Sequence, residues 1–406
     1  MSPSEILDVD IYDRSRYADG APHEVFAHLR RTDPVHWQEM PGQPGYWALL
    51  THADVLWASR RHDLFSSELG GITVEDMDPD ALAGMRDMLL GMDPPRHRVM
   101  RKPLVPSFSK KVISGLEPMI RDLCREIFAE VPDGEPVDVV TQVAAHLPTR
   151  IVGGMLGLPR SDWEHLHRLA AAAARSVSGD AVDANLEAIS ELALYGMEHA
   201  GRRRAAETGG ALPEDLTTLM LHGDFGGQQL TDLDFTLIFV QLFVAANDTT
   251  VGMMSGGLHE LLRHPDQLAE LRREPDLVAS AVEEILRYAN PLHYFRRTAL
   301  ADVELHGRQI QAGDKVALYY TSANRDETVF DDPQRFDIRR SPNPQISFGF
   351  GEHYCLGVHL ARLEGRVFFE ELLATFPRIE QVGPATRTAS NFNNGLDALP
   401  VLLGRS

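Results

Sequence analysis

One long helical pattern, from Leu233 to Arg263, constrains the fold more than any other feature of the sequence. Thr231 is a suitable N-cap for this helix, and Pro265 ends it because proline cannot continue a helix from within. At 1.5 Å per residue, about 30 residues extend roughly 45 Å, which is enough to cross a whole domain. The sequence therefore predicts a helix that runs through the core of the protein.

Helical patterns dominate the chain beyond residue 95, whereas strand patterns are short. Further helices are expected at Val112–Glu130, Pro136–Leu156, Ser161–Ser176, Ala184–Glu207, Pro265–Glu274, Asp276–Tyr288 and Val358–Thr375. Strands are expected within about residues 1–70 and 300–345, as at Asp302–Leu305 and Lys315–Tyr320. The predicted fold class is mainly α with a minor β component, in a single domain spanning residues 1–406.

Charge and hydropathy exclude several classes of function. The formal net charge is −20, from 59 acidic and 39 basic residues, so nucleic acid and anionic membrane are not expected partners. The longest apolar stretch, Leu237–Ala246, is interrupted by Gln241 and is shorter than the roughly 18 residues of a membrane span. The acidic first ten residues do not resemble a signal peptide. We therefore expect a cytoplasmic protein.

The two cysteines have very different surroundings. Cys124 lies in a helical pattern, where a small buried apolar residue is the simplest interpretation. Cys355 lies in the segment Ile346-Ser-Phe-Gly-Phe-Gly-Glu-His-Tyr-Cys-Leu-Gly-Val358, just before an expected helix. Glycines let a flat ligand approach the backbone, and the N-terminus of a helix favours a thiolate. A glycine-rich turn around a buried cysteine is the structural alternative.

The pattern Phe348-x-x-Gly351-x-x-x-Cys355-x-Gly357 resembles the haem-binding signature of the cytochrome P450 superfamily. The resemblance implies the triangular-prism fold of that family, with the long central helix lying over the haem. It implies haem b as cofactor, with the Cys355 thiolate as the iron ligand. Phe348, Gly349 and Gly357 are then expected beside the cofactor.

Within the long helix, Ala245-Ala-Asn-Asp-Thr-Thr250 resembles the oxygen-activation motif of the same family. The resemblance implies that Thr249 hydrogen-bonds bound oxygen and that Asp248 relays protons. Ala245 and Ala246 are expected against the haem, although Ala246 stands where glycine is usual. Without the other motifs, a threonine bonded back to a helix carbonyl would be an adequate interpretation.

Two further groups of charged residues match family landmarks. His97 and Arg101 fall one helical turn apart and, with Arg297 and His353, resemble the contacts to the haem propionates, which need several donors when buried. Glu284 and Arg287 share a helix face, and by resemblance they form a buried structural triad with Arg335.

The resemblance implies a monooxygenase that uses dioxygen to hydroxylate a C–H bond of a largely apolar small molecule, with a steroid side chain, branched lipid or terpenoid favoured. Hydroxylation in natural-product biosynthesis, including that of a carrier-protein-bound amino acid, is an alternative. A non-catalytic haem-thiolate sensor and a peroxide-driven enzyme also remain open. Expected substrate contacts are Met88, Leu89, Leu90, Leu242, Phe243, Leu292, His293, Tyr294 and Phe392.

Electrons are expected from a ferredoxin and its reductase, because no flavin or nicotinamide domain fits beside this fold in 406 residues. An acidic ferredoxin needs a positive surface on its partner. Basic residues that could provide it are Arg98, Lys102, Lys110, Lys111, Arg362 and Arg366. Scattered solvated charges are the alternative interpretation of these residues.

Overall fold

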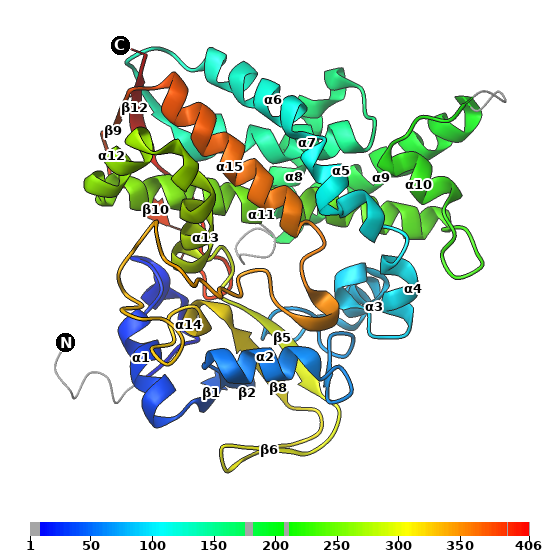
Figure 1. Cartoon of the computed structure of the whole chain (residues 1–406). Coiled ribbons are helices and arrows are strands. Elements are labelled where there is room, and N and C mark those ends of the chain that lie inside the picture. Colours follow the sequence, from blue (N-terminus) through cyan, green and yellow to red (C-terminus); the bar gives the residue numbers. More distant parts are fainter. Residues whose placement is uncertain (1–8, 175–181, 207–210, 388, 406) are drawn as a thin grey trace.

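The computed structural model describes residues 9–174, 182–206, 211–387 and 389–405, and its helices confirm the mainly α fold class (Figure 1). The helices before the long central one are α1 His23–Thr32, α2 His52–Arg60, α3 Pro79–Asp87, α4 Arg96–Arg101, α5 Lys110–Ser114, α6 Glu117–Glu130, α7 His146–Met155, α8 Trp163–Ala174, α9 Val182–Ala206 and α10 Leu216–His222. The helices after the long central one are α12 Pro265–Arg273, α13 Val278–Ala289, α14 Tyr320–Ala323 and α15 Val358–Thr375.

The predicted central helix is confirmed as α11, Asp232–Arg263. Thr231 and Asp234 form a capping box at its start: the Asp234 amide donates to Thr231 Oγ1 at 3.1 Å, and the Thr231 amide donates to Asp234 Oδ2 at 3.1 Å. The helices α7, α8, α9, α13 and α15 pack around it (Figure 1). Within the described residues, α11 is the one helix long and apolar enough to cross a membrane. Over half of its most apolar 18-residue stretch is buried inside the protein.

A five-stranded sheet lies beside the helical part, in the order β1-β2-β8-β5-β3. Its strands are β1 Val35–Met40, β2 Gln43–Leu49, β3 Phe65–Ser66, β5 Tyr294–Ala299 and β8 Lys315–Tyr319. β2 and β8 are parallel, with Tyr46 opposite Lys315, whereas the other pairs are antiparallel. The hairpin β6 Val303–Leu305 and β7 Arg308–Ile310 extends from this sheet. The sheet thus joins the first 70 residues to the segment after α13.

Strands near the C-terminus were not predicted. They are β9 Arg378–Gln381, β10 Thr386–Arg387, β11 Leu396–Ala398 and β12 Pro400–Gly404. β12 pairs with both β9 and β4 Pro136–Asp138, which was predicted to begin a helix. The prediction was wrong there because Val137 pairs with Val401, more than 250 positions away.

The remaining helix boundaries differ by a few residues from those predicted. The region expected as one helix from Val112 divides into α5 and α6 at Gly115-Leu116, just before Pro118 in the first turn of α6. The expected helix ends Ser176 and Glu207, and residues 1–8 of the acidic N-terminus, lie outside the described residues.

Candidate active site

Cys355 ends a loop that leads directly into α15, as predicted. The Cys355 amide donates to the Phe348 carbonyl at 3.0 Å and closes the loop around the turn Gly351–His353. The guanidinium of Arg362 lies over the Phe348 ring, 4.9 Å from its centroid. The first turns of α15 therefore hold both ends of the loop.

Glycines give this loop its shape. Gly349 and Gly351 have φ of +68° and +73°, in the left-handed region that favours glycine. A Cβ on Gly351 would lie 2.1 Å from the Ser59 carbonyl oxygen of α2, so the loop packs there against backbone. At Gly357, by contrast, no described heavy atom lies within 4 Å of such a Cβ, so this side of the loop is open to close approach.

The surroundings of Cys355 act on its thiol in opposite directions. Burial raises the pKa of the Cys355 thiol, while the Gly357 amide and the charges of Arg101 and Arg362 lower it. A metal ion at the sulfur deprotonates a thiol outright, and those donors then stabilise the thiolate. Cys124, in contrast, is 1% exposed in the core on α6, as predicted.

The four predicted carboxylate-binding residues come together from three segments. His97 and Arg101 lie on α4, Arg297 on β5, and His353 in the cysteine loop. The rings of His97 and His353 are 4.4 Å apart. Burial, followed by the charge of Arg101, lowers the pKa of His97 to about 4, and burial and the charge of Arg297 lower the pKa of His353. Nearby anions would oppose these shifts.

These donors fit a haem. Both ring nitrogens of His97 are buried and have no hydrogen-bond partner among the described residues, a state that costs about 1–3 kcal/mol for each group. Arg297 is only 8% exposed, and burial lowers its pKa. Two buried carboxylates would satisfy such groups with charge-assisted hydrogen bonds. A single cysteine sulfur beside an open glycine is the ligand that a haem-thiolate iron requires.

The buried charge cluster on α13 differs from the prediction in its third member. Arg287 donates to both oxygens of Glu284 at 2.7 Å, and neither side chain is exposed. The third guanidinium belongs to Arg340, whose Nε lies 3.2 and 3.1 Å from the two Glu284 oxygens. Arg335 supplies its carbonyl to Arg287, while its own side chain is 65% exposed near Asp337. The prediction of Arg335 as the third charge was therefore wrong.

The path of the loop after α14 explains this difference. Arg340 turns back to bind the carbonyls of Asp331 and Asp332 as well as Glu284. The same network reaches the cysteine loop, because Asn324 donates to Ser347 Oγ at 2.7 Å and accepts from the Ile346 amide at 2.8 Å. The cluster thus supports the segment that leads to Cys355.

The middle of α11 combines polar and accessible residues inside the fold. Ala245 is exposed and Ala246, Asp248 and Thr249 are half-buried, although Phe243 is fully buried. The Thr249 hydroxyl donates to the Ala245 carbonyl at 2.8 Å. The helix continues without a break through Ala246, the position where glycine was expected. This face of α11 therefore offers small side chains, an acid and a hydroxyl.

The expected substrate contacts divide into two groups. Met88, Leu90, Leu242 and Leu292 are half-buried. The packed interior, with exposed fractions of 0–7%, contains Leu89, Phe243, His293, Tyr294 and Phe392. His293 interacts with the Thr321 hydroxyl at 2.9 Å, and the Tyr294 hydroxyl accepts from the Val74 amide at 3.2 Å. The structure thus uses the polar atoms of His293 and Tyr294 in internal hydrogen bonds.

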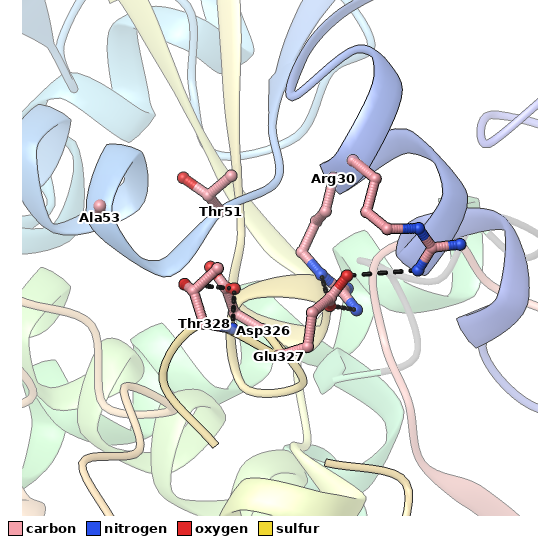
Figure 2. Close-up of a pocket in the computed structure, with 7 residues that line it drawn as sticks. Arg30, Thr51, Ala53, Asp326, Glu327 and Thr328 are labelled. Carbon is pink, nitrogen blue, oxygen red and sulfur yellow. Dashed lines mark hydrogen bonds and ion pairs between the residues drawn. The ribbon is translucent and has the colours of Figure 1, made fainter. Parts of the chain in front are cut away.

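A hollow of about 400 Å³ elsewhere in the molecule shares no residue with this site (Figure 2). Its lining residues are Arg30, Arg31, Thr51, Ala53, Asp326, Glu327 and Thr328. Glu327 pairs with Arg30 at 2.8 Å and with Arg31 at 3.2 Å. Both of its arginines are therefore paired with a carboxylate of the same hollow.

Sequence reasoning missed two residues that contact the predicted site. Arg340 lies in a loop with several arginines, and no local pattern distinguishes it from Arg335 or Arg339. Asn393 donates to Asp248 Oδ2 at 2.5 Å, although 145 positions separate them. The neighbouring Phe392 was expected near substrate, which was the one available signal for Asn393.

Comparison with known proteins identifies the family. Residues 198–391 match the family model described as Cytochrome P450. The chain is 36% identical to a steroid C26-monooxygenase of Mycolicibacterium smegmatis, over 97% of this chain and 93% of the relative. It is 36% identical to a methyl-branched lipid omega-hydroxylase of Mycobacterium tuberculosis (94% and 90% covered) and 34% identical to a linalool 8-monooxygenase of Pseudomonas putida (97% and 98%).

Solved structures agree in both fold and sequence. Cytochrome P450 CYP268A2 of Mycobacterium marinum, in complex with pseudoionone, has a TM-score of 0.88 at 33% identity, with 98% of each chain covered. P450BioI, in complex with an acyl carrier protein ligated to hexadec-9Z-enoic acid, has a TM-score of 0.84 at 28% identity, covering 94% of this chain and 98% of that one. The chain therefore belongs to the cytochrome P450 family of haem-thiolate monooxygenases.

Proposed function

We propose that this enzyme hydroxylates a C–H bond of a largely apolar small molecule, with residues 1–406 acting as one catalytic domain. One observation carries the proposal: the loop of Cys355 brings His353 beside His97 of α4, and the charges of Arg101 and Arg297 act on both rings. Relatives named for a steroid, a methyl-branched lipid and linalool support an apolar substrate. A steroid side chain, branched lipid or terpenoid is accordingly favoured.

The cofactor-binding roles follow from the donors present. When bound, haem b supplies the reductive activation of dioxygen and the oxidising equivalents for hydroxylation. Cys355 Sγ is the proposed iron ligand, stabilised by the Gly357 amide. The proposed propionate partners are His97, Arg101, Arg297 and His353. The loop would lie beside the macrocycle through Phe348, Gly349 and the open side at Gly357.

The polar residues of α11 would control protons. Asp248 would hold a proton and supply it toward the oxygen site, where Thr249 Oγ1 would accept a hydrogen bond. The hydroxyl hydrogen of Thr249 is directed to the Ala245 carbonyl, so the Oγ1 lone pairs are oriented to accept. The small side chains of Ala245 and Ala246 would leave space at this face of the helix for a small oxidant to approach.

A P450 monooxygenase takes its electrons from a redox partner, and we propose a ferredoxin with its reductase. Lys102, Lys110 and Lys111 are exposed on and beside α4 and α5, near the start of α15. Three arginines expected in the same surface are instead paired: Arg98 with Glu352, Arg362 with Glu283, and Arg366 with Glu117. The lysines are therefore the proposed docking charges for an acidic partner. Their contribution should fall as salt rises.

We also propose a cytoplasmic location without membrane or nucleic-acid partners. The net charge of −20 opposes binding to phosphate-rich surfaces. The apolar helix α11 is surrounded by other helices of the fold, as expected for a core helix.

A carrier-bound substrate is the second candidate, because a related structure is a complex with a ligated acyl carrier protein. The decisive experiment is a titration of the haem spectrum with sterols, methyl-branched fatty acids, acyclic terpenoids and carrier-bound acyl or aminoacyl groups. A shift from low to high spin, followed by product formation with NAD(P)H, ferredoxin and reductase, would identify the class. Only carrier-bound groups causing the shift would favour the second candidate.

The same assay separates the two other functions left open. A shift without product under reducing conditions would support a non-catalytic sensor. Product with peroxide but none with NAD(P)H and redox partners would support a peroxide-driven enzyme.

A further inference from the structure

The acid on α11 is joined to the turn Asn391–Asn394 near the C-terminus. Asn393 Nδ2 donates to Asp248 Oδ2 at 2.5 Å. We propose that Asn393 is a positioning residue that fixes the Asp248 carboxylate in the orientation required for proton transfer. This inference rests on the proposed proton-relay role of Asp248.

The amide of Asn393 is itself held in one orientation. Its Oδ1 accepts from the Gly395 amide at 2.8 Å, and its backbone amide donates to Ser390 Oγ at 3.0 Å. Rotating the side-chain amide by half a turn would place two acceptors together at Asp248 and two donors together at Gly395. The local hydrogen bonds therefore require that Nδ2, the donor, faces the carboxylate.

The turn Asn391–Asn394 is anchored to the end of α13. Asn394 Nδ2 donates to the carbonyls of Ala289 and Asn290 at 3.0 and 3.1 Å. The Asn394 amide donates to the Pro291 carbonyl at 2.9 Å, and the His293 amide donates to the Phe392 carbonyl at 2.8 Å. Asn393 thus links a rigid turn to the middle of α11.

This contact makes the two carboxylate oxygens of Asp248 inequivalent. Nδ2 donates to Asp248 Oδ2 and lowers the basicity of that oxygen, so protonation of the carboxylate is favoured at Oδ1. The transferable proton is then carried by Oδ1. A carboxylate that presents one oxygen at a fixed position transfers protons efficiently, because small misplacements of a catalytic group cost large factors in rate. Loss of the amide would remove one of the contacts that orient the carboxylate.

The test is a double-mutant cycle in the complete enzyme with its redox partners, using Asn393→Ala, Asp248→Asn and the double variant. We expect Asn393→Ala to lower kcat about tenfold, to raise the solvent kinetic isotope effect and to leave KM within about twofold. In the Asp248→Asn background, the same substitution should cause no further loss, since it acts through Asp248. Asn393→Ser, which retains an acceptor for Gly395, is the second variant if the turn is disturbed.

Asn394→Ala is the matched control. It removes hydrogen bonds from the same turn to the end of α13, and the described contacts of Asn394 do not include Asp248. Damage to the turn should alter KM or thermal stability in both Asn393→Ala and Asn394→Ala. The solvent isotope effect should rise in Asn393→Ala and stay unchanged in Asn394→Ala. An equal isotope effect in the two variants would overturn the inference.

A second measurement does not depend on turnover. In the diamagnetic, carbon-monoxide-bound ferrous protein labelled with ¹⁵N-asparagine, the Asn393 side-chain amide is assigned by its absence in Asn393→Ala. Its hydrogen exchange should be roughly tenfold slower in wild type than in Asp248→Ala, because a charge-assisted hydrogen bond is lost. Equal exchange rates would show that the contact is not maintained in the loaded enzyme.

The outcomes separate this inference from the proposed function. If Asp248→Asn does not slow NAD(P)H-driven turnover, the proposed role of Asp248 is wrong, and the inference is wrong with it. If Asp248→Asn slows turnover but Asn393→Ala does not, or if the two losses multiply, the role of Asp248 stands and only the positioning role fails.

Discussion

The cysteine loop and the middle of α11 are the two functional regions of this enzyme, and they are built differently. The loop takes its shape from nearby glycines and from the helix that follows, and the Glu284–Arg287–Arg340 cluster supports the segment before it. The middle of α11 is regular helix, and its acid is oriented from outside by Asn393. The loop suits a permanent ligand, whereas the helix presents the groups that we propose exchange protons.

The difference shows where disruption should be most severe. Removing a group from the cysteine side should prevent cofactor binding or destabilise the fold, because its partners are buried charges. Removing a group from the α11 side should leave a folded, loaded enzyme that uses its electrons less productively.

The largest effect is expected for Cys355→Ala. The variant should lose the thiolate-type carbon-monoxide difference spectrum of the reduced protein, together with product formation, because no other described cysteine is near the loop. Cys124→Ala is the control, and it should keep the spectrum at a cost of about 1 kcal/mol in stability. A thiolate-type spectrum persisting in Cys355→Ala would refute the ligand assignment.

The next effect distinguishes the three arginines around Glu284. Arg287→Ala should lower the free energy of unfolding by about 3–5 kcal/mol, because it leaves a buried carboxylate without its bidentate partner. Arg340→Ala should cost about 1–3 kcal/mol, and the exposed Arg335→Ala no more than about 0.5 kcal/mol. Urea unfolding of the three variants measures this order, and a larger loss for Arg335→Ala than for Arg340→Ala would contradict it.

A pH-dependent effect is expected at Glu364 on α15. Burial raises the pKa of Glu364 to about 8, and its Oε2 has no hydrogen-bond partner among the described residues. The pKa of Glu364 is higher in the folded protein than in the unfolded chain. The free energy of unfolding is therefore highest below the unfolded-state pKa and falls as pH rises toward 8. Relative to Glu364→Gln, wild type should therefore lose roughly 2–3 kcal/mol between pH 6 and 8. Paired urea titrations give this difference, and a constant offset between the two proteins would rule out a neutral Glu364.

The smallest effect is expected for the Thr249 hydroxyl on α11. Thr249→Ala should consume NAD(P)H at a similar rate but form about tenfold less product per NAD(P)H, because the hydroxyl that accepts a hydrogen bond at the oxygen site is gone. Thr250→Ala is the neighbouring control: Thr250 is 5% exposed and should affect stability more than coupling. Equal coupling in the two variants would assign Thr249 the purely structural role of bonding to the Ala245 carbonyl.

Much of the fold and part of the site were predictable because their causes are local. The cap at Thr231, the helix after Gly357 and the pairing of Glu284 with Arg287 involve residues within four positions of one another. The strand β4, the choice of Arg340 and the contact of Asn393 with Asp248 join distant segments. Periodicity does not reveal which distant segment supplies a partner.

The sequence by itself determined the central helix, the glycine-shaped cysteine loop and, through its motifs, the haem-thiolate chemistry. Helix periodicity, caps and left-handed glycines depend on residues within one or two helical turns of each other, so they can be recognised from the sequence alone. The tertiary structure alone decided which arginine completes the Glu284 cluster and which amide orients Asp248. Those choices depend on loop paths and on the burial of charges, which arise only when distant parts of the chain pack together.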